Sequence, residues 1–128
     1  MTHANAELLE RAFAAFGRDP IVVARSLAED CVWRVPGANA MSGEYRGRDE
    51  VLRFLRQTFV LTNRTYRTEL KYVVADDARA VGVYRARGER EGRTLDIEQA
   101  LFCEIRGGEI AEVSAVPFDP VAFDAFWA

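Results

Sequence analysis

The strongest constraint on the fold lies in the second half of the chain, where apolar and polar residues alternate with a period of two. The alternation covers four segments, 65–74, 80–87, 94–105 and 110–116. Turn residues at 76–77, 88–92 and 107–108 separate these segments. Long strands that follow one another through such turns form an antiparallel meander, so we expect one sheet face to be buried and the other exposed.

The first half of the chain repeats its apolar residues at helical spacing instead. The repeat between residues 8 and 16 predicts a first helix, with Asn5 as its N-cap. The Asp-Pro pair at 19–20 predicts the start of a second helix that reaches about Ala28. A third helical pattern follows Gly47. Three helices therefore precede the four long strands.

Two further segments complete the pattern. Residues 31–35 predict a short strand, and the loop of about ten residues that follows it contains Tyr45 and is long enough to border a site. A second Asp-Pro pair, at 119–120, starts a short last helix. Three aromatic residues are expected to anchor that helix to the body: Phe118, Phe123 and Trp127.

The predicted order of elements is α-α-β-α-β-β-β-β-α. Helices and strands are segregated along the chain, so the fold class is α+β. A length of 128 residues fits one domain over 1–128. A curved sheet buries its apolar face against the helices, and a pocket remains wherever the sheet curves more than the helices can fill.

Charge and composition narrow the classes of partner. The net charge is -3 and the basic residues are scattered, which argues against a nucleic-acid partner. No apolar run approaches the roughly 20 residues that cross a bilayer, and the N-terminus lacks the pattern of a signal peptide. We therefore expect a cytoplasmic protein with no membrane partner.

The cysteines and the histidine give little indication of function. Cys31 and Cys103 lie in strand-like apolar segments outside any paired motif, which predicts two buried, reduced thiols. His3 is the sole histidine, and it lies in a terminal segment that we expect to be mobile. The sequence therefore predicts no metal site and no cofactor.

Five stretches of the chain resemble, in order, proteins of the SnoaL-like family. They are RAFAAFGRDP at 11–20, LAEDCVWRVPG at 27–37, SGEYRGRDEV at 42–51, GRTLD at 92–96 and RGGEIAEV at 106–113. This family belongs with the ketosteroid isomerases to the nuclear transport factor 2-like superfamily. The resemblance implies a cone-shaped, curved and mostly antiparallel sheet wrapped on three N-terminal helices, with a pocket inside. It also implies a homodimer formed through the outer sheet face.

The resemblance also locates the reaction centre of a ketosteroid isomerase, which needs a carboxylate base, a neutral carboxylic acid and a tyrosine. By that resemblance, the base position is Val35 and the acid position is Leu101. The tyrosine belongs on the first helix, but the first tyrosine of this chain is Tyr45. Because neither aliphatic side chain can move a proton, we expect no ketosteroid-isomerase mechanism here.

The phase of the strand alternation decides which side chains enter the pocket. Placing Leu101 inward also places Tyr84 and Gln99 inward, and it turns Glu98 outward. The full set of expected pocket residues is Trp33, Val35, Tyr45, Leu55, Phe59, Tyr84, Gln99, Leu101 and Cys103. Tyr84 and Gln99 either bind the polar group of a ligand or form a satisfied pair in the core, and the sequence leaves both readings open.

Three functional hypotheses follow. In the first, the pocket binds a small, hydrophobic, cyclic molecule, and a volume above roughly 300 Å³ with Tyr84 or Gln99 exposed to it favours this reading. In the second, the chain is a non-catalytic dimeric structural or binding protein. In the third, it is a cyclase-, isomerase- or epoxide-hydrolase-type enzyme with a relocated carboxylate, in which Glu98 or another acid is turned into the pocket by a β-bulge. An outward Glu98 eliminates this third version.

Overall fold

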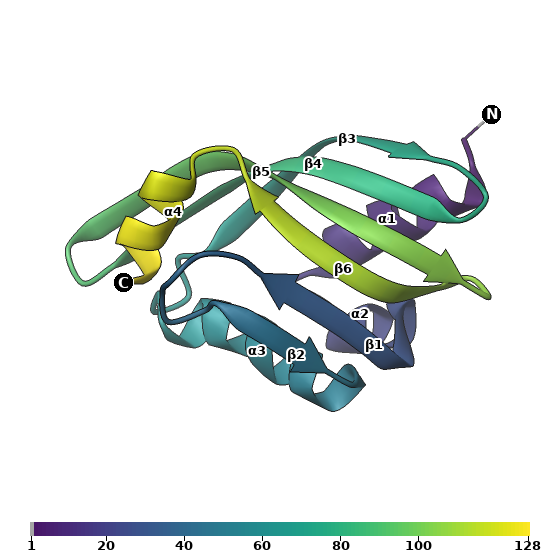
Figure 1. The fold of residues 1–128 in the computed structure, drawn as a ribbon, viewed down its shortest axis with the longest axis horizontal. Coiled ribbons are helices and arrows are strands. Elements are labelled where there is room, and N and C mark those ends of the chain that lie inside the picture. Colours follow the sequence, from purple (N-terminus) through teal and green to yellow (C-terminus); the bar gives the residue numbers. More distant parts are fainter. Residues whose placement is uncertain (1) are drawn as a thin grey trace.

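The computed structural model describes residues 2–128 and shows helices packed against one curved sheet (Figure 1). In chain order the elements are α1 (Ala4–Ala15), α2 (Pro20–Ser26), β1 (Leu27–Val35), β2 (Gly43–Arg46), α3 (Arg48–Val60), β3 (Arg67–Ala75), β4 (Arg79–Arg90), β5 (Arg93–Arg106), β6 (Glu109–Pro117) and α4 (Pro120–Trp127). The predicted α+β class is confirmed.

The strands form one mixed sheet in the order β2-β1-β6-β5-β4-β3. The long strands β3 to β6 pair antiparallel as the predicted meander, and β1 joins β6 in parallel. Helices α1, α2 and α3 lie against the concave side of the sheet, and α4 packs at the end near the β4–β5 hairpin (Figure 1). The concave side is therefore the buried side.

The segment after β1 corrects the prediction of a structureless loop. Gly43–Arg46 pairs antiparallel with residues 32–35 as strand β2, so Tyr45 lies in a strand opposite Trp33. The start of β1 also differs from the prediction, because α2 ends at Ser26 instead of Ala28. Leu27 pairs with Ile110 of β6, and this tertiary pairing replaces the last helical turn.

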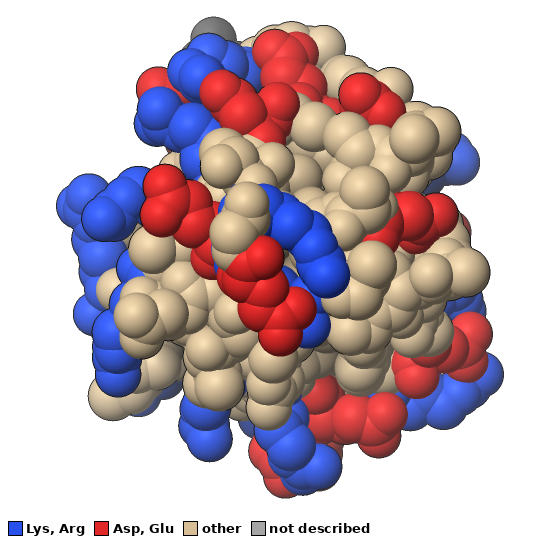
Figure 2. Space-filling model, turned by 90° about the vertical axis from the view of Figure 1, so that its left-hand side faces the viewer, with Lys and Arg blue, Asp and Glu red and all other residues tan. Residues whose placement is uncertain are grey.

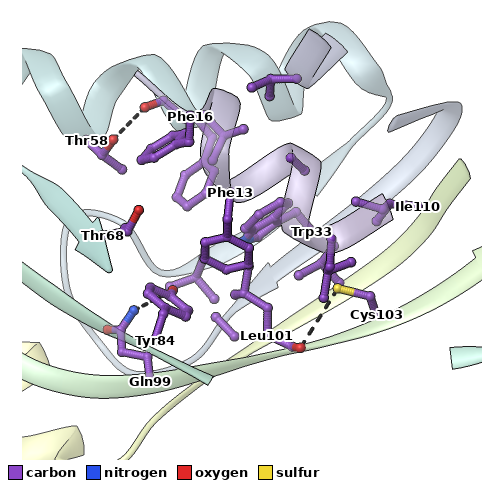
Figure 3. A pocket seen from close by; sticks show the side chains of 18 of the residues that line it. Phe13, Phe16, Trp33, Thr58, Thr68, Tyr84, Gln99, Leu101, Cys103 and Ile110 are labelled. Atoms are coloured by element: carbon purple, nitrogen blue, oxygen red, sulfur yellow. Dashed lines mark hydrogen bonds between the residues drawn. The ribbon is translucent and has the colours of Figure 1, made fainter. Parts of the chain in front are cut away.

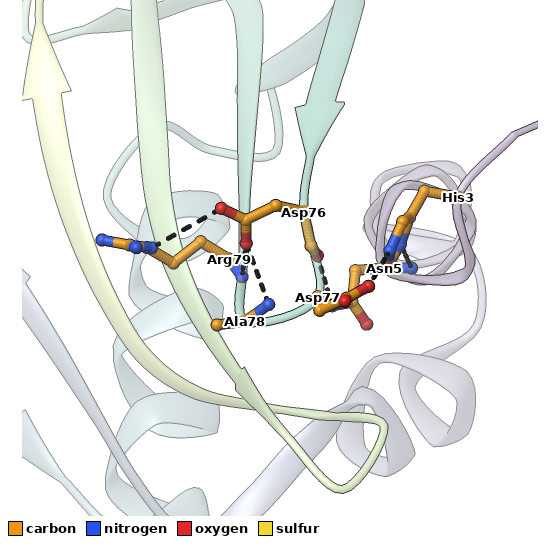
Figure 4. A network of polar contacts seen from close by, with 6 residues as sticks. All are labelled: His3, Asn5, Asp76, Asp77, Ala78 and Arg79. Atoms are coloured by element: carbon orange, nitrogen blue, oxygen red, sulfur yellow. Dashed lines mark hydrogen bonds and ion pairs between the residues drawn. The ribbon is translucent and has the colours of Figure 1, made fainter.

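The N-terminal segment is tied to the β3–β4 turn, which corrects two expectations (Figure 4). His3, and not Asn5, caps α1: its Nδ1 accepts a hydrogen bond from the Asn5 backbone N–H at 3.0 Å. The Asn5 side chain instead donates to the carbonyl of Asp76 at 2.9 Å. His3 Nε2 lies 2.9 Å from Asp77 Oδ1. His3 and Asn5 therefore both contact the β3–β4 turn, in a segment that we expected to be mobile.

Helix α4 is anchored by aromatic residues, although not by all those predicted. Phe123 and Trp127 are buried as expected, whereas Phe118 is 54% exposed. The backbone N–H of Phe118 still continues the sheet by donating to the carbonyl of Glu98, so its side chain points to the outer face. Arg90 and Arg93 of the β4–β5 hairpin close the C-terminal end of α4, where the last helical carbonyls lack partners. Both guanidinium groups donate to the carbonyl of Ala128, at 2.6 and 2.9 Å.

Two further observations concern the cysteines and the question of membrane-spanning helices. Cys31 and Cys103 are both buried and free, as predicted. Among residues 2–128, no helix combines the length and the hydropathy needed to cross a membrane.

Candidate functional site

A cavity of about 100 Å³ lies between the concave sheet face and the helices (Figure 3). Its walls are mostly aromatic and aliphatic, with a few neutral polar side chains. They comprise Leu9, Ala12, Phe13, Phe16, Val23, Ser26, Leu27, Trp33, Val35, Met41, Phe54, Leu55, Thr58, Tyr66, Thr68, Tyr84, Gln99, Leu101, Cys103, Ile110, Val113, Ala115, Phe123 and Trp127. Every helix and almost every strand contributes a side chain, so the cavity depends on the whole fold.

Seven of the nine residues expected at the pocket line this cavity. They are Trp33, Val35, Leu55, Tyr84, Gln99, Leu101 and Cys103. Tyr45 and Phe59 are absent from its walls. The Tyr45 hydroxyl donates to the carbonyl of Met41 at 2.7 Å, and its ring packs on Phe54 with centroids 4.4 Å apart. Phe59 packs on Phe16 with centroids 4.8 Å apart, so both rings support the lining from behind.

Helices supply several wall residues that strand alternation did not reveal. Phe13 and Phe16 come from α1, and Phe123 and Trp127 come from α4. The helical spacing of Phe13 and Phe16 marked them as buried, but only the packing of α1 across the sheet places them at the cavity. Gly82 permits that packing, because a Cβ there would lie 3.1 Å from the Phe13 ring.

The polar groups of the cavity gather on the sheet side, where three neighbouring strands meet. Gln99 of β5 donates from Nε2 to the hydroxyl of Tyr84 on β4 at 2.7 Å. Tyr66, which precedes β3, brings its hydroxyl within reach of both groups. Figure 3 shows Tyr84 and Gln99 on the floor of the cavity below Phe13. Gln99 is 3% exposed, and its Oε1 is buried with no hydrogen-bond partner among residues 2–128.

The remaining hydroxyl groups on the helical walls are already paired with their own helices. Ser26 donates to the carbonyl of Val22 at 2.8 Å, and Thr58 donates to that of Leu55 at 2.6 Å. Such bonds to a carbonyl of the preceding turn occupy the hydroxyl hydrogen. The remaining polar groups of the cavity therefore lie on its sheet side, at Gln99, its tyrosine neighbours and the hydroxyl of Thr68 on β3.

Among residues 2–128, no group that carries charge at neutral pH lines the cavity, because none of the lining residues is Asp, Glu, His, Lys or Arg. Burial raises the pKa of the Cys103 thiol to about 12, and it raises the pKa values of the Tyr66 and Tyr84 phenols above their usual range. Desolvation disfavours the anionic form of each of these groups, so all three keep their protons at neutral pH.

The structure overturns the version of the enzyme hypothesis that needs a relocated carboxylate. Glu98 is exposed on the outer face, and β4 and β5 pair without a register shift around it. Val35 and Leu101 occupy the cavity wall as aliphatic residues at the positions where the resemblance puts a base and an acid. Within residues 2–128, no three His, Cys, Asp or Glu side chains come together as metal ligands.

The outer sheet face combines charged pairs with exposed apolar residues. Arg85 and Asp96 form a two-bonded ion pair, with both N–O distances at 2.7 Å. The exposed apolar residues are Tyr72, Val74, Phe102, Val116 and Phe118. Figure 2 views the molecule from the left-hand side of Figure 1, the end at which α4 and the β4–β5 hairpin lie, and there acidic and basic side chains are interspersed with uncharged surface. No single sign of charge dominates that view.

Comparison of the sequence with known proteins identifies a family and several relatives. Residues 9–113 match the family described as the SnoaL-like domain. Uncharacterized proteins of Mycobacterium tuberculosis and Mycobacterium bovis are each 35% identical over 127 residues, covering 98% of this chain and 97% of the relative.

Solved structures show the same fold. Bal32a, from a soil-derived mobile gene cassette, is 28% identical, with a TM-score of 0.94 over 98% of this chain and 97% of that chain. A protein of unknown function with a cystatin-like fold from Xanthomonas campestris is 23% identical, with a TM-score of 0.90 over 97% and 98% of the two chains.

Proposed function

The chain belongs to the SnoaL-like domain family, and we propose that its cavity binds a small, hydrophobic, cyclic molecule without the acid–base groups of a ketosteroid isomerase. The observation that carries this proposal is the lining itself. Aromatic and aliphatic side chains form the walls, and a small polar group of Tyr84 and Gln99 lies at the floor. Apolar walls with few convergent polar groups are typical of small-molecule sites.

The volume of the cavity bears on the size of the ligand. At about 100 Å³ it is below the roughly 300 Å³ that is typical of sites for drug-sized molecules, so the volume criterion set from the sequence is not met. An engineered apolar cavity of about 150 Å³ binds benzene. The proposed ligand, or the part of it that enters the cavity, is therefore no larger than about one six-membered ring.

The small volume also supports a second candidate function, in which the interior is only core and the chain serves as a non-catalytic dimeric structural protein. The missing acid and base fit this candidate equally well. The two candidates differ in one observable, because only the first requires the cavity to admit a molecule from solution.

Titration with benzene and toluene, followed by two-dimensional amide NMR spectra, tests the proposal. We expect shifts at the backbone of residues around the cavity, with saturation at millimolar concentrations. Ala115→Leu fills the cavity and should abolish these shifts, since Ala115 is on its wall. Val116→Leu, a change of the exposed neighbour, is the matched control and should leave them intact. Absence of shifts in the folded wild-type protein would favour the structural candidate.

We further propose that the chain forms a homodimer through the outer face of the sheet. Strand register brings the exposed apolar residues together: Val74 and Phe102 both pair with Val81, while Val116 pairs with Ala100. Contiguous exposed apolar residues are typical of interaction surfaces, and isologous contact between two copies of one patch is the commonest way to cover them. Sedimentation velocity at micromolar concentration tests this proposal, which a purely monomeric boundary would contradict.

The location proposed for this protein is the cytoplasm. The observation that supports it is the pair of buried free thiols, Cys31 and Cys103, which suits a reducing compartment. Thiol titration after denaturation of freshly purified protein should yield two reactive groups per chain. A yield near zero would place the protein in an oxidising environment.

A further inference from the structure

We propose that the ligand carries a hydroxyl group, which donates a hydrogen bond to Gln99 Oε1 and accepts one from the tyrosine hydroxyl beside it. This inference rests on the proposed function, because it assumes that the cavity is occupied by a small molecule. It adds the chemical class of the ligand, a neutral ring alcohol or phenol, and it assigns Gln99 as the residue that selects it.

The first step is the unpaired acceptor. Gln99 Oε1 is buried in a side chain that is only 3% exposed, and it has no donor within residues 2–128. Buried amide oxygens are nearly always paired, so an exception calls for an explanation. Gln99 lines the cavity, and rotation about its terminal torsion is soft. Rotation about this torsion is the movement that the proposal requires to bring Oε1 to a molecule in the cavity.

The second step is the unpaired donor. The Gln99 amide already donates to the Tyr84 hydroxyl at 2.7 Å, and the Tyr66 hydroxyl lies near both groups. Each phenol carries one hydrogen, and a chain of donors that starts at the Gln99 amide leaves the last phenolic hydrogen without an acceptor. The three side chains together thus present one free O–H and one free carbonyl oxygen.

The third step is the chemistry that satisfies both groups. A hydroxyl accepts one hydrogen bond and donates another, so it closes the ring of bonds from a tyrosine to Gln99 Oε1. A ketone or an ether accepts only, and it leaves Oε1 unpaired. A carboxylate is excluded by charge, because the walls contain no Lys, Arg or His and an unpaired buried charge is costly.

The experiment compares phenol with benzene and cyclohexanol with cyclohexanone in the wild-type protein by NMR titration. A wholly apolar cavity prefers benzene, because phenol must leave its bonds to water. Paired at Gln99, phenol should bind about threefold to tenfold more tightly than benzene, and cyclohexanol should exceed cyclohexanone by a similar factor. Equal affinities within each pair, or a preference for benzene and cyclohexanone, would overturn the inference and leave the proposed function standing.

Gln99→Leu sharpens the test, because it removes the amide and keeps a similar volume. The phenol-to-benzene affinity ratio should fall to one or below, while benzene still binds. Glu98→Gln, on the exposed neighbour of Gln99, is the matched control and should keep the wild-type ratio. An unchanged ratio in Gln99→Leu would overturn the inference. If this variant does not fold, the two wild-type comparisons decide alone. Failure of all four compounds to bind would overturn the proposed function, and the inference with it.

Discussion

The two faces of strand β5 show how one segment serves two environments. Its inward side chains include Leu95, Gln99 and Leu101, which are buried and carry no charge. Its outward side chains include Asp96 and Phe102, which are exposed to solvent. The inner face thus depends on packing and on one polar cluster, whereas the outer face depends on ion pairs and leaves apolar surface uncovered. We therefore expect stability and the proposed site to depend mainly on the inner face, and the proposed association to depend on the outer face.

The largest predicted effect comes from an inner residue that supports the fold without lining the cavity. Leu95 is 2% exposed, so Leu95→Ala should lower the free energy of unfolding by about 2–5 kcal/mol through lost transfer energy and a new cavity. Thr94→Ala on the exposed side of the same strand should change it by less than about 0.5 kcal/mol. Urea unfolding of both variants measures the difference. Similar losses in the two variants would break the distinction between the faces.

Much of this fold could be predicted because the alternation within each long strand indicates which of its side chains share a face. The alternation through β5 indicated which residues point inward, and burial of Leu101 and Cys103 agrees with it. Strand β2 was missed because its four residues show no alternation of their own, and it exists only by pairing with β1. Likewise, His3 caps α1 although Thr2 and Asn5, which are common capping residues, lie close by in the sequence. Tertiary contacts outweigh local propensity at both places.

The next prediction concerns the uncovered outer surface. Phe102 is 51% exposed and lies at the middle of the proposed dimer face. Phe102→Asp should raise the dissociation constant of the dimer about 30-fold or more, as expected for an interface hot spot worth at least ~2 kcal/mol. Thr94→Ala serves as the control that keeps the dimer. Sedimentation at several concentrations measures both constants. Dimerisation that survives in Phe102→Asp would move the interface to another surface.

The site was less predictable than the fold, for a related reason. Strand parity indicated the inward direction of Tyr84 and Gln99, because both lie in long regular strands. The walls contributed by Phe123 and Trp127 depend on where α4 packs, which no local pattern encodes. Tyr45 looked like a pocket residue because it appeared to belong to a loop, but its pairing in β2 directs the hydroxyl to Met41 instead.

A smaller effect should appear at alkaline pH, and it originates on the inner face. Burial holds the pKa values of Tyr66 and Tyr84 above the unfolded value of about 10. The unfolded chain therefore loses these protons first, so the stabilisation is fully present below about pH 10 and is lost as the pH rises toward the folded values. In this range, each such group lowers the free energy of unfolding by at most about 1.4 kcal/mol for each unit of pH increase.

Tyr84→Phe removes one of several buried groups whose pKa values burial raises, among them Tyr66 and the Cys103 thiol. It should therefore reduce the slope between pH 10 and 11 by up to about 1.4 kcal/mol per pH unit without abolishing it. Its unfolding free energy at pH 7 should already be lower by about 1 kcal/mol, since the bond to Gln99 is lost. Tyr72→Phe, which removes an exposed phenol from the outer face, is the matched control. Urea unfolding at pH 7, 10 and 11 gives the slopes. A slope in Tyr84→Phe equal to that of the wild type would show that the inner phenols ionise without cost.

The smallest effect is expected from the Arg85–Asp96 pair, the outer-face counterpart of the Tyr84–Gln99 pair across the same two strands. The bonds from Arg85 hold the pKa of Asp96 below its usual value. A depressed folded pKa contributes stability above the unfolded pKa of about 3.9, and that contribution is lost as the pH falls through the folded value. Asp96→Asn should therefore melt slightly below the wild type at pH 7, and the two melting curves should converge below about pH 4.

Added salt offers a second way to weaken the same pair. Exposed ion pairs are screened by dissolved ions, so the melting difference between Asp96→Asn and the wild type should also shrink in 1 M salt at pH 7. The Tyr84–Gln99 bond is neutral and buried, and the effect of Tyr84→Phe should not shrink in this way. A difference for Asp96→Asn that persists at acid pH and in salt would mean that Asp96 acts through packing, and the two faces of the sheet would then be stabilised by the same kind of interaction.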